Sequence, residues 1–135
     1  MLLATATAWA HHSVIANFDR DTVITLEGIV KAVHLRNPHS QYVLSVKSED
    51  GSVAEWFIEW SDRNALIRRG VDLDLIQPGD SLTVTVWPSR RLPQVGYFVQ
   101  AALPDGAIYK DCGFLEFRRA VENSVEFRCD EAQGR

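Results

Sequence analysis

The fold is decided by residues 22–36, which form the string TVITLEGIVKAVHLR. Branched side chains dominate this stretch, and Ile24 and Leu26 alternate with polar residues, as in a strand that buries one face. The alternation shifts at Gly28, and Val30 then continues it. A glycine at such a shift favours a bulge, by which small barrels bend a strand. The stretch therefore predicts a long, bent strand.

Further strands are expected on both sides of one short helix. Asn37-Pro38-His39-Ser40 predicts a turn, and an Asp-Gly turn over residues 49–52 predicts a hairpin. Ser61 is a good N-cap and Gly70 a good C-terminal stop, so a helix is expected over residues 61–70. The strands expected after the first are residues 42–47, 53–60, 81–88, 96–103 and 107–109.

This order of elements indicates the fold class. Three strands, a helix and two more strands is the order of the OB barrel. We therefore predict a mainly β protein, a small OB-like five-stranded antiparallel barrel with one short helix between strands 3 and 4. The barrel domain is expected over residues 11–109. Another small antiparallel barrel or sandwich with one helix is the alternative.

The composition is that of one globular domain. The chain has 135 residues, of which 46% are hydrophobic and 24% charged, and its formal net charge is −4. Chains of this size rarely split into two domains, and the apolar fraction argues against global disorder. No apolar run reaches the roughly 20 residues of a membrane-spanning helix. The acidic balance argues against nucleic acid as a partner, because a phosphate backbone is bound by basic surface.

The first residues have the features of the end of a secretory signal. Residues 2–10 are apolar or small, and Ala8-Trp9-Ala10 has the small-x-small form of a signal-peptidase site. We interpret residues 1–10 as a residual signal peptide and expect a periplasmic or secreted protein. A short N-terminal strand or tail is the alternative.

Two cysteines, Cys112 and Cys129, stand near the C-terminus. Neither belongs to a C-x-x-C pair, which disfavours a redox motif or a zinc site. In an exported protein a disulfide is expected, and it would clamp a C-terminal extension, residues 110–135, against the barrel. Two unrelated buried thiols are the alternative.

All four histidines, His11, His12, His34 and His39, fall within the first 39 residues. His34 and His39 flank one turn, beside the usual ligand-binding mouth of an OB barrel. If cleavage follows Ala10, His11 offers an α-amine and an imidazole to one metal ion. His39 or His34 would complete a nitrogen-rich site that suits Cu(II). Zinc remains open, because three histidines and a water also fit that ion.

Other interpretations of the histidines remain open. Cleavage one residue earlier would put His12 third from the terminus, where backbone amides complete a square-planar copper site. Adjacent histidines at a new terminus can also be merely solvated. His34 can pair with a carboxylate on the barrel surface, and His39 can cap the Asn-Pro turn.

Other conspicuous residues favour a structural role. Trp56 and Trp60 share a strand face, and large aromatic side chains most often fill the core. Glu55 and Glu59 lie about 13 Å apart on one strand, too far for a glycosidase pair. The basic pair at residues 68–69 is expected on the solvated surface. No nucleophile elbow, Walker loop or dinucleotide motif occurs, so an enzyme is disfavoured.

Several motifs, in order along the chain, resemble one known family. They are His11-His12-Ser13, Asn17-Phe18-Asp19, Asn37-Pro38-His39, residues 61–70 and Pro78-Gly79-Asp80. Over about residues 10–106 the chain resembles a family of small exported bacterial proteins of unknown function. The resemblance implies an exported β-barrel, and it places His11, His12 and His39 on motif positions. It implies no activity, and the segment with both cysteines departs from the pattern.

These observations predict an exported, non-enzymatic small β-barrel. It is expected to bind a transition metal, copper first, through His11, His12, His34 and His39. The expected partner is the metal ion or another periplasmic protein. A metal-free module that binds a partner protein or an oligosaccharide is the alternative. An enzyme with a histidine-braced copper is a third hypothesis.

Overall fold

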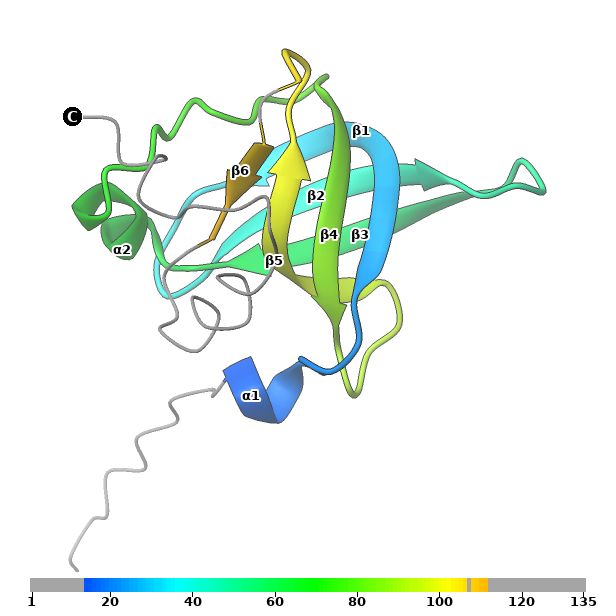
Figure 1. Cartoon of the computed structure of the whole chain (residues 1–135), viewed down its shortest axis with the longest axis horizontal. Coiled ribbons are helices and arrows are strands. Elements are labelled where there is room, and N and C mark those ends of the chain that lie inside the picture. The colour runs from blue at the N-terminus through cyan, green and yellow to red at the C-terminus, as the bar shows by residue number, and fades with distance from the viewer. Residues whose placement is uncertain (1–13, 107, 112–135) are drawn as a thin grey trace, which may run out of the picture.

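The computed structural model describes residues 14–106 and 108–111, and Figure 1 shows its elements. In chain order these are α1 (Val14–Asn17), β1 (Ile24–His34), β2 (Ser40–Lys47), β3 (Val53–Trp60), α2 (Arg63–Arg68), β4 (Ser81–Pro88), β5 (Val95–Ala102) and β6 (Ile108–Lys110). Neither of the described helices has the length and apolarity needed to cross a bilayer. The predicted signal remnant, His11, His12, Cys112, Cys129 and the extension beyond Asp111 lie outside the described residues.

The strands form one sheet that closes on itself. Its order is β3-β2-β1-β4-β5-β6, and an additional pairing joins β3 to β5. This closing pair is parallel, whereas the other described strand pairs are antiparallel. An odd number of strands cannot alternate in direction around a closed ring, so one pair has to be parallel. The predicted OB-like five-stranded barrel is therefore confirmed, and its pairing is corrected from antiparallel to mixed.

β1 bends, but not where the sequence predicts it. The register between β1 and β2 shifts between Val30 and Ala32, so the bulge lies at Lys31 and not at Gly28. Gly28 keeps regular pairing and lies so close to β2 that a Cβ would overlap the carbonyl oxygen of Ser45. The close approach of the two strands, rather than a bulge, therefore requires this glycine.

α2 begins one residue later than predicted, because its N-cap is different. The side chain of Asp62, not of Ser61, accepts a hydrogen bond from the amide of Ala65 at 2.9 Å. Ser61 directly follows β3, and its carbonyl accepts a hydrogen bond from the amide of Ser40 at 3.3 Å. Gly70 has a φ of 72° and ends the helix as predicted.

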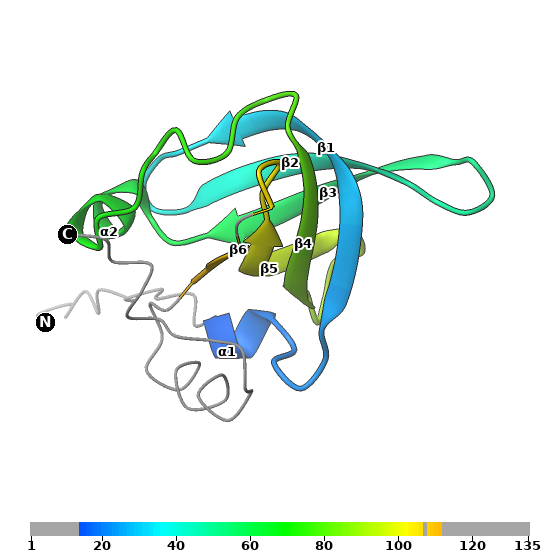
Figure 2. The same ribbon diagram turned by 45° about the horizontal axis from the view of Figure 1, so that its top comes forward.

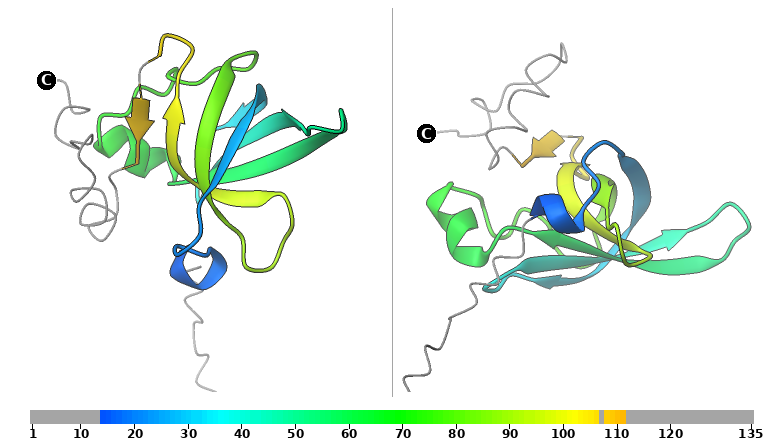
Figure 3. Two further views of the ribbon diagram at one scale, coloured as in Figure 1. Left: turned by 45° about the vertical axis from the view of Figure 1, so that its right-hand side comes forward. Right: turned by 90° about the horizontal axis from the view of Figure 1, so that it is seen from below.

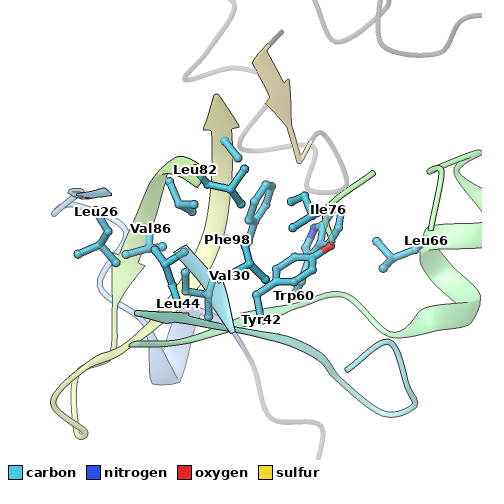
Figure 4. Packing of buried hydrophobic residues seen from close by; sticks show 13 residues of the cluster. Leu26, Val30, Tyr42, Leu44, Trp60, Leu66, Ile76, Leu82, Val86 and Phe98 are labelled. Carbon is cyan, nitrogen blue, oxygen red and sulfur yellow. The ribbon is translucent and has the colours of Figure 1, made fainter. Parts of the chain in front are cut away.

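The barrel interior holds the larger hydrophobic core, which we name the inner cluster (Figure 4). Strand alternation supplies it: Ile58 and Trp60 of β3 point inward, and Phe57 and Glu59 point outward. Trp60 is almost fully buried, which confirms the structural role predicted for it. The members are Leu26, Val30, Tyr42, Leu44, Ile58, Trp60, Leu66, Ile76, Leu82, Val84, Val86, Phe98 and Ala101.

A smaller core, which we name the outer cluster, lies on the outward face of β4 and β5. Its members are Phe18, Trp87, Tyr97 and Val99, with Val14 and Val95 packed against them. The carbonyl of Asn17 accepts a hydrogen bond from the amide of Arg90 at 2.8 Å, and Phe18 forms a β-bridge with Ser89. These contacts hold α1 beside the β4–β5 loop, where Figure 2 shows it.

Candidate functional site

One row of side chains crosses the outward face of the barrel at the end where β1 finishes. Strand register aligns His34 with Gln41, Gln41 with Glu59, and Glu59 with Tyr97. Neighbouring strands are about 4.8 Å apart, so the row gathers an imidazole, an amide, a carboxylate and a phenol. We name these four residues the outer row. OB barrels bind ligands on the face of strands 2 and 3, which run side by side in Figure 3.

His39 lies beside the outer row. Its Nδ1 atom is 3.9 Å from Oε1 of Glu59, and the two side chains are 37% and 31% exposed. That separation is too long for a hydrogen bond. It is shorter than two metal–ligand bonds of about 2.0–2.2 Å laid end to end. One ion can therefore contact both atoms, and both are open to solvent.

The β1–β2 loop holds His39 in place. The predicted turn at Asn37-Pro38 is confirmed, because β1 ends at His34 and the chain returns antiparallel to it from Ser40. Ser40 is fully buried, and its hydroxyl donates a hydrogen bond to the carbonyl of Arg36 at 3.4 Å. Its amide donates to Ser61, at the end of β3. The residue next to His39 is thus tied both to the loop and to the strand that carries Glu59.

His34 occupies the last position of β1 and is exposed. Within the described part of the chain it forms no ion pair, and the histidine found beside a carboxylate is His39. Its register partner Gln41 separates it from Glu59 by one strand. His34 therefore shares the face of His39 without touching the same carboxylate.

The described residues do not complete a metal site by themselves. Over residues 14–106 and 108–111, no three His, Cys, Asp or Glu side chains are grouped so that they could hold an ion. His39 and Glu59 come together, whereas His11 and His12 of the predicted set lie outside the described residues. A complete site built from these residue types needs at least one further ligand.

The outer cluster shares one residue, Tyr97, with the outer row. Val14 packs against the outer cluster, whose Tyr97 is aligned with Glu59 and shares a 3.4 Å hydrogen bond with Ser61. His12 precedes Val14 by two residues.

Tyr97 closes the outer row on the side of the outer cluster. Its ring centroid lies 5.5 Å from that of Phe18 and 6.0 Å from that of Trp87. Burial raises the pKa of Tyr97, and the carboxylate of Asp111 raises this pKa further. The phenol therefore stays protonated at neutral pH and acts as a hydrogen-bonding group toward Ser61.

A buried ion pair lies where β6 ends. Asp111 is 3% exposed, pairs with Arg69 and accepts a hydrogen bond from Nε1 of Trp60 at 2.8 Å. Arg69 was expected on the solvated surface, and this expectation is wrong because the folded chain brings a distant carboxylate to it. Removing one partner of such a pair leaves a buried charge unpaired. The pair therefore fastens the chain before Cys112 to α2 and β3.

The rest of the outward face of β2 and β3 is partly apolar. Phe57 is 39% exposed and aligned with Val43. Lys31, at the bulge of β1, pairs with Glu55 on the same face. The carbonyl of Gln94 accepts a hydrogen bond from the amide of Phe57 at 2.9 Å, so the β4–β5 loop borders the face. An accessible ring beside polar groups suits an extended ligand.

Glu59 was not predicted as a neighbour of His39. The hairpin register carries the signal. With a loop of three residues, 49–51, that ends at Gly51 with a φ of 86°, Lys47 is aligned with Val53 and therefore Gln41 with Glu59. His39 is two residues before Gln41, on the same face of the strand. Register, rather than any local motif, identifies this pair.

The sequence matches a profile of known proteins over residues 1–97, described as "Family of unknown function (DUF6152)". The chain belongs to this family. The predicted membership of a family of unknown function is thus confirmed. The matched residues include the four histidines and Glu59.

The chain has no significant match among curated proteins. Among solved structures, it is similar to the mitochondrial single-stranded DNA-binding protein Rim1 of S. cerevisiae. The TM-score is 0.46 and the sequence identity 9%, over 62% of this chain and 93% of that chain.

Proposed function

We propose that this protein is an exported, non-enzymatic β-barrel that binds a transition metal, with copper as the first candidate. The observation that carries the proposal is the approach of His39 and Glu59 to 3.9 Å on the face where OB barrels bind ligands. Imidazole and carboxylate are ligands that zinc accepts, and imidazole also suits copper. His11 and His12 supply the further nitrogen ligands. His34 stands across the same turn as an additional ligand.

The N-terminal segment supports this proposal. Removal of residues 1–10 by a signal peptidase would leave His11 with a free α-amine beside its imidazole. Nitrogen-rich chelates favour Cu(II), which heads the affinity order of the divalent metals. Val14 packs against the outer cluster, whose Tyr97 is aligned with Glu59, and His12 precedes Val14 by two residues.

The proposed compartment is the periplasm or the exterior of the cell. In that setting Cys112 and Cys129 form a disulfide, which clamps the extension of residues 110–135. The role that follows is carriage, buffering or delivery of the metal to another exported protein.

The test is Cu(II) titration of two metal-free forms, the full chain and a form that begins at His11. The shorter form should bind Cu(II) with a visible d–d band, and the full chain more weakly because it lacks the amine at His11. His39→Ala should weaken the affinity by about tenfold or more. Glu59→Gln should weaken it less, because it removes the charge and keeps the shape.

The matched control is Glu55→Gln, because Glu55 lies on the same strand face and pairs with Lys31. This variant should leave the affinity for Cu(II) unchanged. A form that begins at His11 and shows no d–d band would contradict the proposal. So would an unchanged affinity in both His11→Ala and His39→Ala. Competition with Zn(II) then separates the two metals.

A metal-free binding module is the second candidate, favoured by the exposure of Phe57. A partner protein or an oligosaccharide would contact this ring on the face of β2 and β3. In that case Phe57→Ala abolishes ligand binding, whereas His11→Ala and His39→Ala leave it intact. A glycan array and a pull-down with the purified wild type and these variants would distinguish the two candidates.

A further inference from the structure

The solvent face of α2 carries two exposed cations beside an apolar side chain. Arg63, Asn64, Ile67 and Arg68 are exposed, whereas Leu66 belongs to the inner cluster. Residues four apart lie on the same side of a helix, so Arg63 and Ile67 are neighbours, and Arg68 follows directly.

Arg36 joins this face from the β1–β2 loop. Its carbonyl accepts a hydrogen bond from the amide of Arg63 at 3.2 Å, so the two backbones are in contact. Its side chain is exposed. We name the set Arg36, Arg63, Ile67 and Arg68 the arginine corner.

The arginines of this corner are not neutralised. In the part of the chain that the structure describes, none of them pairs with a carboxylate, whereas Arg69 pairs with Asp111 and Arg90 with Asp19. Asp62, at the start of α2, is engaged as the helix cap. In a chain with a formal net charge of −4, this corner thus carries three exposed arginines that have no carboxylate partner among the described residues.

The positive charge is confined to the corner itself, because exposed Asp72 and Asp74 follow α2 within six residues, and an acidic turn lies at the far end of the molecule. Figure 1 shows α2 at one end and the turn of the β2–β3 hairpin at the other. That turn carries Glu49 and Asp50.

We propose that the arginine corner is a docking surface for an acidic segment of a partner protein. Arginine forms bidentate pairs with carboxylates and is enriched at protein interfaces. Ile67 supplies an apolar contact between the cations. Docking itself is independent of the proposed metal site. Because Arg36 precedes His39 by three residues, a docked partner also reaches His39, and this last link rests on the proposed function.

An acidic protein fits this surface better than a membrane or a nucleic acid. An anionic bilayer is extended and repels the acidic remainder of the chain, whereas an acidic segment contacts the corner alone. Ile67 is a single apolar side chain, which is too little to anchor a helix in lipid. Single strands bind through exposed aromatic rings, which the corner lacks, and the adjacent barrel face carries Glu55 and Glu59.

The test measures binding of a fluorescein-labelled peptide of Glu, Asp and Gly to the full, metal-free chain at low salt. Arg63→Glu and Arg68→Glu should each weaken binding about fivefold or more, since each reverses one exposed charge. Arg91→Glu is the matched control, because Arg91 is an exposed arginine of the β4–β5 loop. This control should keep the wild-type affinity. Added salt should weaken the wild type.

Two further probes decide between partner classes. Vesicles of phosphatidylcholine and phosphatidylglycerol, and a single-stranded oligonucleotide, should bind more weakly than the peptide. Preference for either of these probes would overturn the proposal. It would also fail if Arg91→Glu weakened peptide binding as much as Arg68→Glu, or if the wild type did not bind the peptide. Arg68→Gln, with circular dichroism as the folding check, separates charge from misfolding.

Discussion

The inner and outer clusters share two strands, β4 and β5, but are closed in different ways. In β4 and β5, Val86 and Phe98 enter the inner cluster, and their neighbours Trp87 and Tyr97 enter the outer one. The barrel encloses the inner cluster, whereas Phe18, from the segment before β1, helps to cover the outer cluster. The outer cluster therefore fastens the N-terminal segment to the barrel, beside the outer row.

The largest effect is expected inside the barrel. Leu44 is fully buried, so Leu44→Ala should lower the free energy of unfolding by about 3 kcal/mol through lost burial and a residual cavity. Urea denaturation measures this loss. Val53→Ala is the control, because Val53 is exposed on the hairpin and should change little. Equal losses in the two variants would mean that the barrel interior is not the main core.

A smaller effect is expected for Phe18→Ala, at about 2 kcal/mol. Phe18 is buried, but the outer cluster can open locally without loss of the barrel. Hydrogen exchange should therefore accelerate at the amide of Phe18, which donates to Val14, and stay slow in β2. Uniform acceleration across the barrel would show that the two clusters unfold as one unit.

Alkaline pH should lower the free energy of unfolding through both clusters, by less than the Phe18→Ala substitution does. Burial raises the pKa of Tyr42 in the inner cluster and of Tyr97 in the outer one, and that of nearby Tyr109 to about 12. In the unfolded chain tyrosine ionises near pH 10, so the unfolded state loses protons first. The contribution of these phenols to the free energy of unfolding is therefore fully present well below pH 10 and is lost as the pH rises. For Tyr42 and Tyr97 together, the loss at pH 10 is about 1 kcal/mol.

Denaturation midpoints measured across the alkaline range test this expectation. Tyr42→Phe should reduce the slope of stability against pH, and Tyr97→Phe should reduce it independently. A midpoint that stays constant through the ionisation of free tyrosine would contradict the burial of these phenols.

The smallest effect is expected for a surface ion pair that belongs to neither cluster. Lys31 and Glu55 are about half exposed, so a double-mutant cycle with alanine should give a coupling of about 0.5 kcal/mol. The coupling should vanish at high salt. A coupling as large as the loss in Phe18→Ala would mean that the bulge of β1 depends on this pair.

Strand alternation and turn chemistry made most of the barrel predictable. The strands Val53–Trp60 and Ser81–Pro88 have the predicted limits, because each alternates cleanly and is bounded by turn residues. The turn at Asn37-Pro38 was predictable for the same reason. Strand alternation and turn residues are local signals, so a single sequence is enough to recognise them.

Features that depend on distant contacts were not predicted. The bulge lies at Lys31, because the pairing of β1 with two strands, rather than a glycine, decides where it bends. The contact of Glu59 with His39 follows from hairpin register, and the pairing of Arg69 with Asp111 joins distant parts of the chain. The candidate site was therefore predicted as a set of histidines and emerged as a histidine beside a carboxylate.

The parallel pairing of β3 with β5 has a consequence for biogenesis. β1 to β4 can associate as they emerge, but the far edge of β3 has no partner until Val95 and its successors are made. A nascent or truncated chain that stops in the β4–β5 loop leaves the edges of β3 and β4 without their partner strand. Such unpaired edges promote aggregation through strand pairing between molecules. Ring closure thus makes the last strands a requirement for solubility, and incomplete copies are expected to be lost to aggregation or proteolysis.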